Sequence, residues 1–500
     1  MPVTLRAKIR LVANLRNIIL LLVLTSLSGV MANEPKEART TIVAELVKNK
    51  EFKLALEKID SGADTNLPLP DGSTALHWAL HHRNDAMVDR LISAGANPNA
   101  VNRYEVPPLW ISCCAGDAIG VERLLNAGAN ANASLRGGES MLMTAARTGT
   151  PQIIEMLLKH GAEVDTTEQS GQTALMWSAA EGNHDASEVL LRYGADPFIT
   201  LPSGFNAFFF AARQGKAKSV FQLLNAGYEI NAKMRPRKKV SKGPNSGMTA
   251  LMLCIENGHF ELAIELINRG ADPNTLGTGY APLHAISWVR KPIRGDGDPP
   301  PIGSGSKSSL DLTRHLLENG AEVNIRHKKH SPRQGGLNRT DATPMILAAE
   351  TGDLALLQLL HQYGGDPHLF NVDRANALLA ASGIGVLSNG DESAGTEQDA
   401  IQTVRYLLDL GAEINSVDNH GKTVMHGAAF KSWPLLIEKL DQWGANEEIW
   451  NQKNQDGWTP LMIAQGHRPG NFRPSETTMI AIERLLKRSE RASASTKQPH

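Results

Sequence analysis

Residues 172–197 decide the fold of this chain and read QTALMWSAAEGNHDASEVLLRYGADP. Thr173 precedes a predicted first helix of about ten residues, which opens at Leu175 and which Gly182 ends. A second short helix follows, and Gly194 closes it. Isolated helices shorter than roughly 12–15 residues are only marginally stable in water. The unit therefore needs copies of itself on both sides to bury its apolar faces.

Such copies fill most of the chain. The closing glycine recurs in five successive steps of 33 residues, from Gly62 to Gly227, and then at longer steps up to Gly444. The apolar residue that opens the first helix recurs in parallel. These opening residues are Leu76, Leu109, Leu142, Leu175, Phe208, Leu251, Leu283, Met345, Leu378, Met425 and Leu461. The recurrence predicts a solenoid, in which each unit packs only on its neighbours.

A 33-residue unit with two helices, a T-x-L-H-like opening and a G-A-D or G-A-N ending resembles the ankyrin repeat. Thr74-Ala75-Leu76-His77 and Thr459-Pro460-Leu461 match the opening closely. The resemblance covers nearly all of residues 38–488. It implies an all-α solenoid of about 12 helix–turn–helix units, joined by β-turn or hairpin fingers.

Further details resemble a group of exported bacterial ankyrin-repeat proteins. They are the LHAISWVR run at residues 283–290 with the Pro/Gly-rich segment after it, Thr396-Glu397, and GWTPL at residues 457–461. This second resemblance implies a compartment and a fold, and it carries no agreed biochemical activity.

The N-terminus carries a different element. Four basic residues precede an apolar run that begins at Ile18, and small residues follow up to Val30-Met31-Ala32. This order is typical of a secretory signal peptide, and an uncleaved anchor helix is the alternative. The run from Ile18 to Ala32 is shorter than the ~20 residues that span a bilayer. We expect cleavage near Ala32, no stable membrane span afterwards, and a periplasmic or secreted protein.

These patterns predict the organisation of the whole chain. Residues 1–32 are the signal peptide, 33–39 a linker, 40–488 the repeat array and 489–500 a disordered polar tail. Within the array, 40–72 is an N-terminal cap, 73–457 holds the repeats, and 458–488 is a C-terminal cap. Insertions interrupt the array at 233–246, 290–308, 326–341 and 383–399. The Pro/Gly-rich insertion at 290–308 is expected to loop outward, since it cannot continue a helix.

Composition narrows the function classes. The chain carries 51 Lys and Arg against 52 Asp and Glu, a balance that disfavours a nucleic-acid partner. It has three cysteines, Cys113, Cys114 and Cys254. Stacked helices lie ~10 Å apart, so the repeats between Cys113 and Cys254 separate them too far for a disulfide. We expect three mostly buried thiols without a disulfide.

Catalytic and metal-binding motifs are missing from the sequence. It contains no H-E-x-x-H, C-x-x-C, G-x-x-x-x-G-K-[ST] or G-x-S-x-G pattern. His77, His284 and His426 occupy the opening motif, where the ankyrin resemblance implies a structural imidazole that bonds across the turn. We therefore expect no catalytic residue, no cofactor and no metal ion.

The ankyrin resemblance implies another protein as the partner, bound in a groove that the fingers and the ends of the first helices line. Tyr, Trp and Arg, which are enriched at binding hot spots, occur at several of these positions. The predicted binding residues are Arg103, Tyr104, Arg147, Glu181, Phe205, Arg213, Gln214, Glu256, Trp288, Glu350, Phe430 and Lys431. An alternative for the aromatic residues, Phe205 and Trp288 above all, is packing beneath the insertions.

Two of the long fingers are basic. Their charged residues include Arg235, Arg237, Lys238, Lys239, Lys328 and Lys329, together with Arg326, His327 and Arg339. One interpretation is a docking edge for an acidic partner or a membrane surface. The other is a pair of solvated loops whose charges keep exposed backbone soluble.

The sequence therefore predicts a non-catalytic protein–protein interaction scaffold that acts outside the cytoplasm, through the groove and the insertions of the C-terminal half. The alternative is an accessory subunit or ligand sensor of an exported enzyme system, in which the insertions at 290–308 and 383–399 meet and form a pocket. A cytosolic regulator is a third interpretation, which requires that the N-terminus is not processed.

Overall fold

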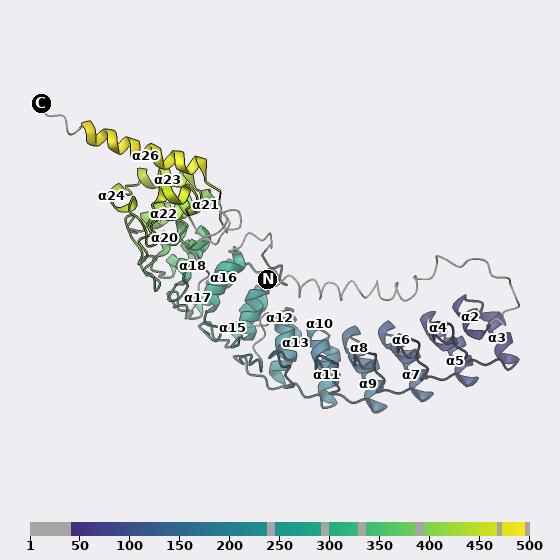
Figure 1. Ribbon diagram of the computed structural model, residues 1–500. Helices are drawn as coiled ribbons and strands as arrows, with labels where there is room; N and C mark the ends of the chain where they lie inside the picture. Colours follow the sequence, from purple (N-terminus) through teal and green to yellow (C-terminus); the bar gives the residue numbers. More distant parts are fainter. Residues whose placement is uncertain are drawn as a thin grey trace, which may run out of the picture. The chain divides into compact units, whose positions relative to one another are not determined.

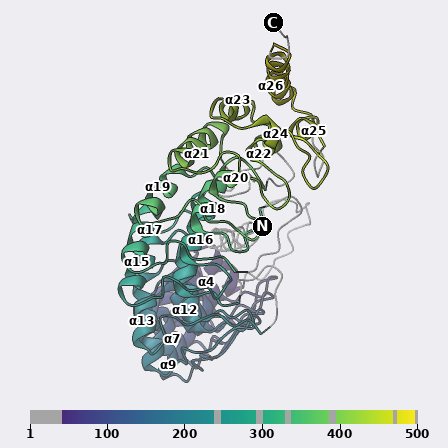
Figure 2. The same ribbon diagram turned by 90° about the vertical axis from the view of Figure 1, so that its left-hand side faces the viewer.

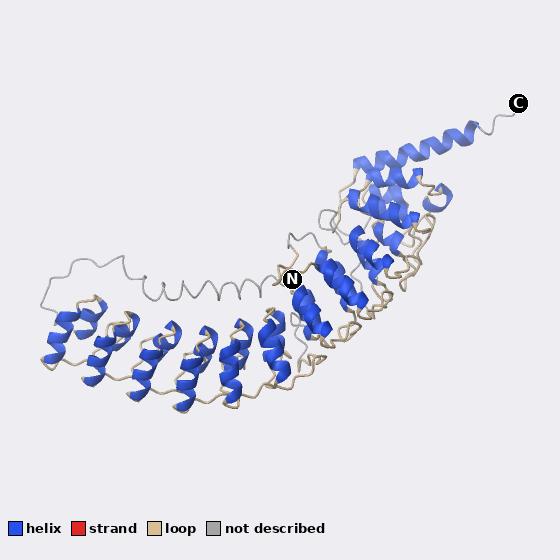
Figure 3. Cartoon of the chain, turned by 180° about the vertical axis from the view of Figure 1, so that it is seen from behind, coloured by secondary structure: helices blue, strands red, loops and turns tan. Residues whose placement is uncertain are grey.

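The computed structural model describes residues 42–237, 246–291, 300–328, 337–385, 395–467 and 473–495. Within these ranges the chain consists of short helices and turns, with one isolated bridge between Ser134 and Ser140 (Figure 3). The predicted all-α solenoid is confirmed. The predicted signal peptide and linker, residues 1–39, lie outside the described residues.

Each repeat contributes a first and a second helix. The first helices are α2 (Val43–Lys48), α4 (Ala75–His81), α6 (Pro108–Ala115), α8 (Met141–Thr148), α10 (Ala174–Glu181), α12 (Ala207–Arg213), α14 (Ala250–Glu256), α16 (Pro282–Arg290), α18 (Pro344–Glu350), α20 (Ala377–Ala381), α22 (Val424–Phe430) and α25 (Pro460–Ala464). The second helices are α3 (Phe52–Asp60), α5 (Asp85–Ser93), α7 (Ala118–Asn126), α9 (Pro151–Lys159), α11 (His184–Arg192), α13 (Ala217–Asn225), α15 (Phe260–Asn268), α17 (Ser309–Glu318), α19 (Leu354–Gln362), α21 (Glu397–Asp409), α23 (Pro434–Gln442) and α26 (Glu476–Ser495). The short α24 (Glu447–Trp450) follows α23.

The chain divides into two compact units. The first holds the described residues of Met1–Phe210, Lys218–Ala226 and Arg235–Pro244, and the second holds those of Ala211–Ala217, Gly227–Met234 and Asn245–His500. In the first unit, α2, α4, α6, α8 and α10 pack side by side in one row, and α3, α5, α7, α9 and α11 form a second row (Figure 1). In the second unit, α14, α16, α18, α20, α22 and α25 form one row, and α15, α17, α19, α21, α23 and α26 form the other (Figure 2).

The repeat at α10 and α11 shows how the sequence sets the helix ends. Thr173 accepts a hydrogen bond from the backbone N–H of Met176 (3.4 Å) and so caps the start of α10. Gly182 (φ 82°) ends α10, and Gly194 (φ 86°) follows α11. Both glycines adopt the left-handed region that side chains with a Cβ resist. The predicted breaks of this unit therefore lie where the backbone turns.

The core lies between the helices of each repeat and those of its neighbours. Leu175 on α10 and Leu190 on α11 are 1% and 0% exposed. Full burial of such a side chain contributes about 1.5–3 kcal/mol. Ala145 and Ala146 on α8 are fully buried, and their small size lets α6, α8 and α10 approach closely. Cys113 and Cys254 are also buried, and burial raises the pKa of both thiols.

A recurring asparagine joins several of the repeats to the next one. Asn99, four residues after Gly95, donates through Nδ2 to the carbonyl oxygen of Gly128 (2.9 Å). Its Oδ1 accepts from the backbone N–H of Asn130 (2.7 Å). The same pair of bonds is made by Asn66, Asn132, Asn231, Asn274 and Asn324. Backbone groups beyond the ends of these second helices thereby find partners within the chain.

The Pro/Gly-rich insertion does not simply loop outward as expected. Its described part, residues 300–308, returns to the turn between α14 and α15. The N–H of Ser304 donates to His259 Nδ1 (2.9 Å), and the N–H of Ser306 donates to Glu261 Oε2 (2.8 Å). A Cβ on Gly303 would overlap the backbone of Gly258, so the glycine is needed for close approach of two backbones.

The C-terminal end also differs from the expectation. Helix α26 continues to Ser495, so residues 489–495 of the predicted disordered tail are helical. Alanine, glutamate and arginine in this stretch favour a helix that has already started. None of the described helices is both long and apolar enough to cross a membrane.

Candidate binding surface

The sequence prediction centres on the last residues of the first helices, which we call the helix-end row. Its members are Arg147, Glu181, Arg213, Gln214, Glu256, Trp288, Glu350, Phe430 and Lys431. Each lies five or six positions after the apolar residue that opens its first helix. The members therefore occupy matching or adjacent positions at the ends of their first helices.

In the first unit, four of the predicted residues, Arg103, Tyr104, Arg147 and Glu181, lie at least partly at the surface. Arg103 and Tyr104 are exposed, and Arg103 both donates to the Tyr104 hydroxyl (2.8 Å) and stacks on its ring. Arg147 is half-buried, pairs with Glu139 (3.2 Å) and lies over the ring of Trp177. Arg–aromatic pairs of this kind present a planar cation and a large apolar surface together, as binding hot spots do. Glu181 is exposed.

Phe205 does not lie on the surface. It is 5% exposed, and its ring lies 4.9 Å from that of Phe210. Next to it, Gly204 lies so close to the backbone of Arg235 and Pro236 that a Cβ there would be crowded. Phe205 is therefore a buried residue next to the place where the insertion approaches Gly204.

In the second unit, Glu256 and Trp288 are joined through Tyr280. The Tyr280 hydroxyl donates to Glu256 Oε1, and the Tyr280 ring meets Trp288 edge-on at 4.9 Å. Burial raises the pKa of Glu256, and the bond from Tyr280 partly offsets that rise. Arg213 and Gln214 are half-buried, and burial lowers the pKa of Arg213.

Arg339 reaches the same row from the second basic finger. Its guanidinium lies over the ring of Trp288 (5.6 Å to the centroid) and pairs with Glu350 at 3.2 Å. The side chains of Arg339 and Glu350 are 18% and 10% exposed. Sequence reasoning assigned Trp288 and Glu350 to the row but treated Arg339 as a charge of the finger. The pairing of Arg339 has no local signal, because Trp288 lies 51 residues away in the chain.

Phe430 and Lys431 end the row. Phe430 is half-buried with the ammonium of Lys422 over its ring, whereas Lys431 is only 8% exposed. Burial lowers the pKa of Lys431 to about 8, against the attraction of Glu350, which opposes that fall. A predicted surface lysine is thus a buried one.

The basic fingers do not behave as one class. Arg235, Arg237 and Lys328 are exposed, and Lys238, Lys239 and Lys329 lie outside the described residues. Arg326 donates to the carbonyl oxygens of Asp341 and Phe370, and His327 is 6% exposed beside the rings of Tyr280 and His284. Together with Arg339, Arg326 and His327 hold the finger against the repeats. These three residues therefore fit neither of the two interpretations of the basic fingers, a docking edge for an acidic partner or a solvated loop.

Tyr280 is a member of this surface that sequence reasoning missed. It lies three residues before Leu283, and Phe205 lies three residues before Phe208. The repeat register could therefore have identified it.

The flanks of two insertions meet. Arg290 forms a two-pronged pair with Asp353 (2.6 and 3.1 Å), and their side chains are 17% and 3% exposed. The next residue, Lys291, donates to the carbonyl oxygen of Gly352 (3.0 Å) and lies 3.5 Å from Asp399 of the other insertion. The bases of insertions 290–308 and 383–399 thus share one turn, between α18 and α19. Residues 292–299 and 386–394 lie outside the described residues.

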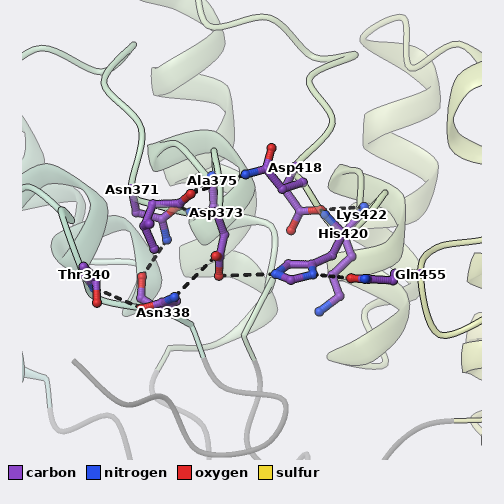
Figure 4. A network of polar contacts seen from close by, with 11 residues as sticks. Asn338, Thr340, Asn371, Asp373, Ala375, Asp418, His420, Lys422 and Gln455 are labelled. Atoms are coloured by element: carbon purple, nitrogen blue, oxygen red, sulfur yellow. Dashed lines mark hydrogen bonds and ion pairs between the residues drawn. The ribbon is translucent and has the colours of Figure 1, made fainter. Parts of the chain in front are cut away.

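Four fingers of the second unit are tied together by polar side chains. Asn338 donates to Asp373 (3.3 Å), and His420 lies between Asp373 (3.4 Å) and Gln455 (2.6 Å), as Figure 4 shows. The bond to Gln455 raises the pKa of His420, burial opposes it, and Asp418 and Asp373 raise it further. His420 is the ionisable link in this network.

The opening histidines have structural partners. His77 Nδ1 lies 3.1 Å from the N–H of Thr74, and Nε2 lies 3.0 Å from the carbonyl oxygen of Val106 in the next finger. His284 and His426 make the matching pairs with Ala342 and Trp458. Nowhere in the described ranges do three His, Cys, Asp or Glu side chains gather as metal ligands would.

The comparisons with known proteins agree with this geometry. Residues 40–135, 109–200, 142–234 and 199–277 match a model of ankyrin repeats in three copies. Residues 40–277 therefore carry ankyrin repeats, and the fold of the described residues is an ankyrin-repeat solenoid. Repeats of this kind indicate a scaffold for protein–protein interaction.

Several curated proteins are similar to parts of the chain. The human transient receptor potential cation channel subfamily A member 1 is 23% identical over 270 residues, which are 49% of this chain and 22% of that protein. The palmitoyltransferase AKR1 of Lachancea kluyveri is 29% identical over 153 residues (30% of this chain and 18% of that protein). The ankyrin repeat and KH domain-containing protein mask-1 of Caenorhabditis elegans is 27% identical over 136 residues (27% and 4%). The chain spans less than a quarter of each of these relatives.

Proposed function

We propose that this chain is a non-catalytic binding protein that acts outside the cytoplasm and holds another protein on its helix-end row and on the insertions of its C-terminal half. The observation that carries the proposal is the row itself. In the second unit, Glu256, Trp288 and Glu350 occupy one register of successive repeats and are joined by Tyr280 and Arg339. Pre-ordered aromatic and charged side chains lower the entropy that binding must overcome.

The test is affinity capture from the native host, followed by mass spectrometry. We expect simultaneous replacement of Arg213, Trp288 and Phe430, members of the row in the second unit, by alanine to abolish capture of a partner. The matched control replaces Ile119, Tyr363 and Leu435, exposed side chains of the second-helix row, and should leave capture unchanged. If the first variant is folded like the original by circular dichroism and still captures the partner, the helix-end row is not the binding surface.

Export is the second part of the proposal. Its support is the order of basic, apolar and small residues that ends at Ala32. N-terminal sequencing of the protein from the periplasm or medium should begin at Asn33. An intact Met1 on protein that remains in the cytoplasm would favour a cytosolic regulator instead.

A second candidate is an accessory subunit or ligand sensor, in which the insertions form a pocket. The contact between Lys291 and Asp399 favours it, because it brings the flanks of both insertions to one turn. A thermal-shift screen with metals, nucleotides, sugars and haem compounds would discriminate the two candidates. A reproducible rise of several degrees favours the sensor, and no rise with any compound favours the scaffold.

A further inference from the structure

The described part of the Pro/Gly-rich insertion, residues 300–308, lies across two turns of the second unit, and we call it the strap. The hydroxyl of Ser304 donates to the carbonyl oxygen of Gly215 (3.3 Å), which lies 89 residues earlier in the chain. The backbone N–H of Ser304 donates to Nδ1 of His259 (2.9 Å), the residue that precedes α15. Gly215, His259 and the strap all belong to the second unit. The strap therefore joins turns that are distant in the sequence.

The partners of His259 fix which of its ring nitrogens carries a proton. Nε2 lies 3.0 Å from the carbonyl oxygen of Arg213, which can only accept, so Nε2 must donate. Nδ1 accepts from the backbone N–H of Ser304, so it must be without a proton. The Ser304 hydroxyl, 3.0 Å from Nδ1, could accept from a protonated ring, but the backbone N–H would still face the added proton. The strap is thus fitted to the neutral imidazole.

Glycines allow this close approach on both sides of the ring. A Cβ on Gly303 would overlap the backbone of Gly258, and a Cβ on Gly215 would overlap the His259 ring and the Ser304 hydroxyl. His259 is only 8% exposed beneath these contacts. The sequence therefore provides room for the strap at the places where it meets the two turns.

The equivalent position of an earlier repeat carries a residue that does not titrate. Asn183 precedes α11 as His259 precedes α15, and its Nδ2 donates to the carbonyl oxygen of Arg147 (2.9 Å). Arg147 and Arg213 each lie five residues after the apolar residue that opens their helix. An amide can thus make the link to the preceding repeat. The imidazole of His259 adds an acceptor for the strap, which a proton can remove.

Other charged groups act on the ring and on the strap. Burial lowers the pKa of His259 below 6.5, the bond to the Arg213 carbonyl opposes the fall, and the charge of Lys216 adds to it. Glu261 on α15 accepts from the N–H of Ser306 (2.8 Å) and is the carboxylate at the strap. A ring whose pKa is lowered in the closed state stabilises that state fully above pH 6.5. This stabilisation is lost as the pH falls below 6.5.

We propose that residues 300–308 form a pH-sensitive strap, which is closed on the neutral ring of His259 and is released when Nδ1 gains a proton. The row members Gln214 and Glu256 lie one and two residues before the glycines that the strap contacts, so its release changes the border of the helix-end row. The inference goes beyond the proposed function, since it does not depend on which partner the row holds.

The first test measures hydrogen exchange of the full chain by mass spectrometry, in peptides that cover residues 300–309. We expect labelling, corrected for the intrinsic rate, to be several-fold faster at pH 5 than at pH 7.5. His259→Asn replaces the ring by an amide that does not titrate, so labelling should be the same at both pH values. A pH dependence that persists in His259→Asn overturns the proposal, as does its absence in the original chain.

Glu261→Gln is the matched control, because it removes the carboxylate at the strap and leaves the imidazole in place. Its labelling should keep the pH dependence of the original chain. If Glu261→Gln abolishes this dependence, the carboxylate is the sensor and the proposal is wrong.

The second test uses the fact that the strap and the added proton exclude each other. Gly303→Ala displaces the strap without changing His259, because its Cβ would overlap the backbone of Gly258. In an NMR titration of the full chain, with the ring signal assigned by its loss in His259→Asn, the pKa of His259 should rise towards 6.5 in this variant. Gly137→Ala is the control, since a Cβ there meets no atom within 4 Å. The same pKa in the original chain and in Gly303→Ala overturns the proposal.

Circular dichroism checks that each variant is folded. If His259→Asn does not fold, the labelling of Gly303→Ala decides instead. With the strap displaced, residues 300–309 should label fast at both pH values. Labelling of Gly303→Ala that remains slow at pH 7.5 and fast at pH 5 would show that the strap contact is not the pH-sensitive element.

Discussion

One side-chain atom separates Asp165 from the asparagines that hold its position in other repeats. Asn132 donates to Gly161 and accepts from Glu163, whereas the carboxylate of Asp165 only accepts, from the N–H of Asp196 (3.1 and 3.2 Å). Burial raises the pKa of Asp165, and the negative charge of Asp196 raises it further. At Asp165 the link between the two repeats therefore lacks the donor that asparagine supplies.

Asp165→Asn should stabilise the first unit by about 1 kcal/mol at pH 7, because the amide supplies the missing donor. Urea denaturation checks it, with Asn132→Asp as the reverse control, which should destabilise by a similar amount. Because the pKa of Asp165 is raised in the folded state, its ionised carboxylate destabilises the fold at neutral pH. The advantage of asparagine should therefore shrink as the pH falls and Asp165 gains a proton. A gain that does not change with pH would contradict this explanation.

The pair of Arg290 and Asp353 is the other residue-scale test. Asp353 is nearly fully buried and also accepts from the N–H of Leu356, so it caps α19 as well. Asp353→Ala should lower the free energy of unfolding by about 3–5 kcal/mol, since it leaves a buried guanidinium without its partner.

Asp409→Ala is the control for the Asp353 variant. It removes an exposed pair with Arg405, in which both side chains are more than half exposed, and should change stability by less than about 1 kcal/mol. Similar losses in the two variants would mean that burial does not set the strength of the Arg290–Asp353 pair.

At the scale of elements, the fingers are the parts that sequence reasoning described least well. Basic side chains there were expected to face a partner or water, yet Arg326 and Arg339 turn inward. Farther along, His420 links its own finger to those of Asp373 and Gln455 (Figure 4). An imidazolium can donate from both nitrogens to these two oxygens, whereas the neutral ring donates from only one.

The fingers around His420 should therefore become less stable as the pH rises. The pKa of His420 is above its ordinary value of 6.5, so its stabilisation is complete below that pH and is lost as the pH passes through the raised pKa. Hydrogen exchange of residues 418–422 and 454–457, corrected for the intrinsic rate, should speed up between pH 6 and 8. His420→Gln should remove the pH dependence. A dependence that survives this substitution would exclude His420 as its source.

At the scale of the whole molecule, buried histidines act in the opposite direction. Burial lowers the pKa of His284 to about 3 and that of His426 to about 4, and it also lowers the pKa of His77. Each ring is neutral in the folded state and gains a proton near pH 6.5 in the unfolded state. Folding stability should thus fall as the pH drops below 6.5, by up to about 1.4 kcal/mol per pH unit for each histidine.

Acid should accordingly loosen the repeats that contain these histidines before the others. Helices α16 and α22 carry His284 and His426, while α8 and α10 carry no histidine at the opening motif. Native-state hydrogen exchange between pH 7 and pH 4.5 should show a greater loss of protection in α16 and α22. Equal losses in all four helices would mean that the buried imidazoles do not control acid stability.

Much of the fold could be predicted, since its determinants are local. The helix breaks at Gly182 and Gly194 and the cap at Thr173 depend on residues a few positions apart. The register of the repeats then located Trp288 and Glu350 in one row. It could not show that Lys431 is buried, because the stem of this side chain lies against Gly383, which belongs to another repeat.

By itself the sequence determined the unit, its length and the order of its copies, because a helix pair that ends in a left-handed glycine is specified within about 33 residues. It also placed the candidate binding positions at the ends of the first helices. Only the tertiary structure decided which charges meet. Arg339 lies on Trp288 and Glu350, Lys291 lies beside Asp399, and Lys431 extends past Gly383. Such pairings depend on where the long insertions return to the array, and neither periodicity nor composition records that path.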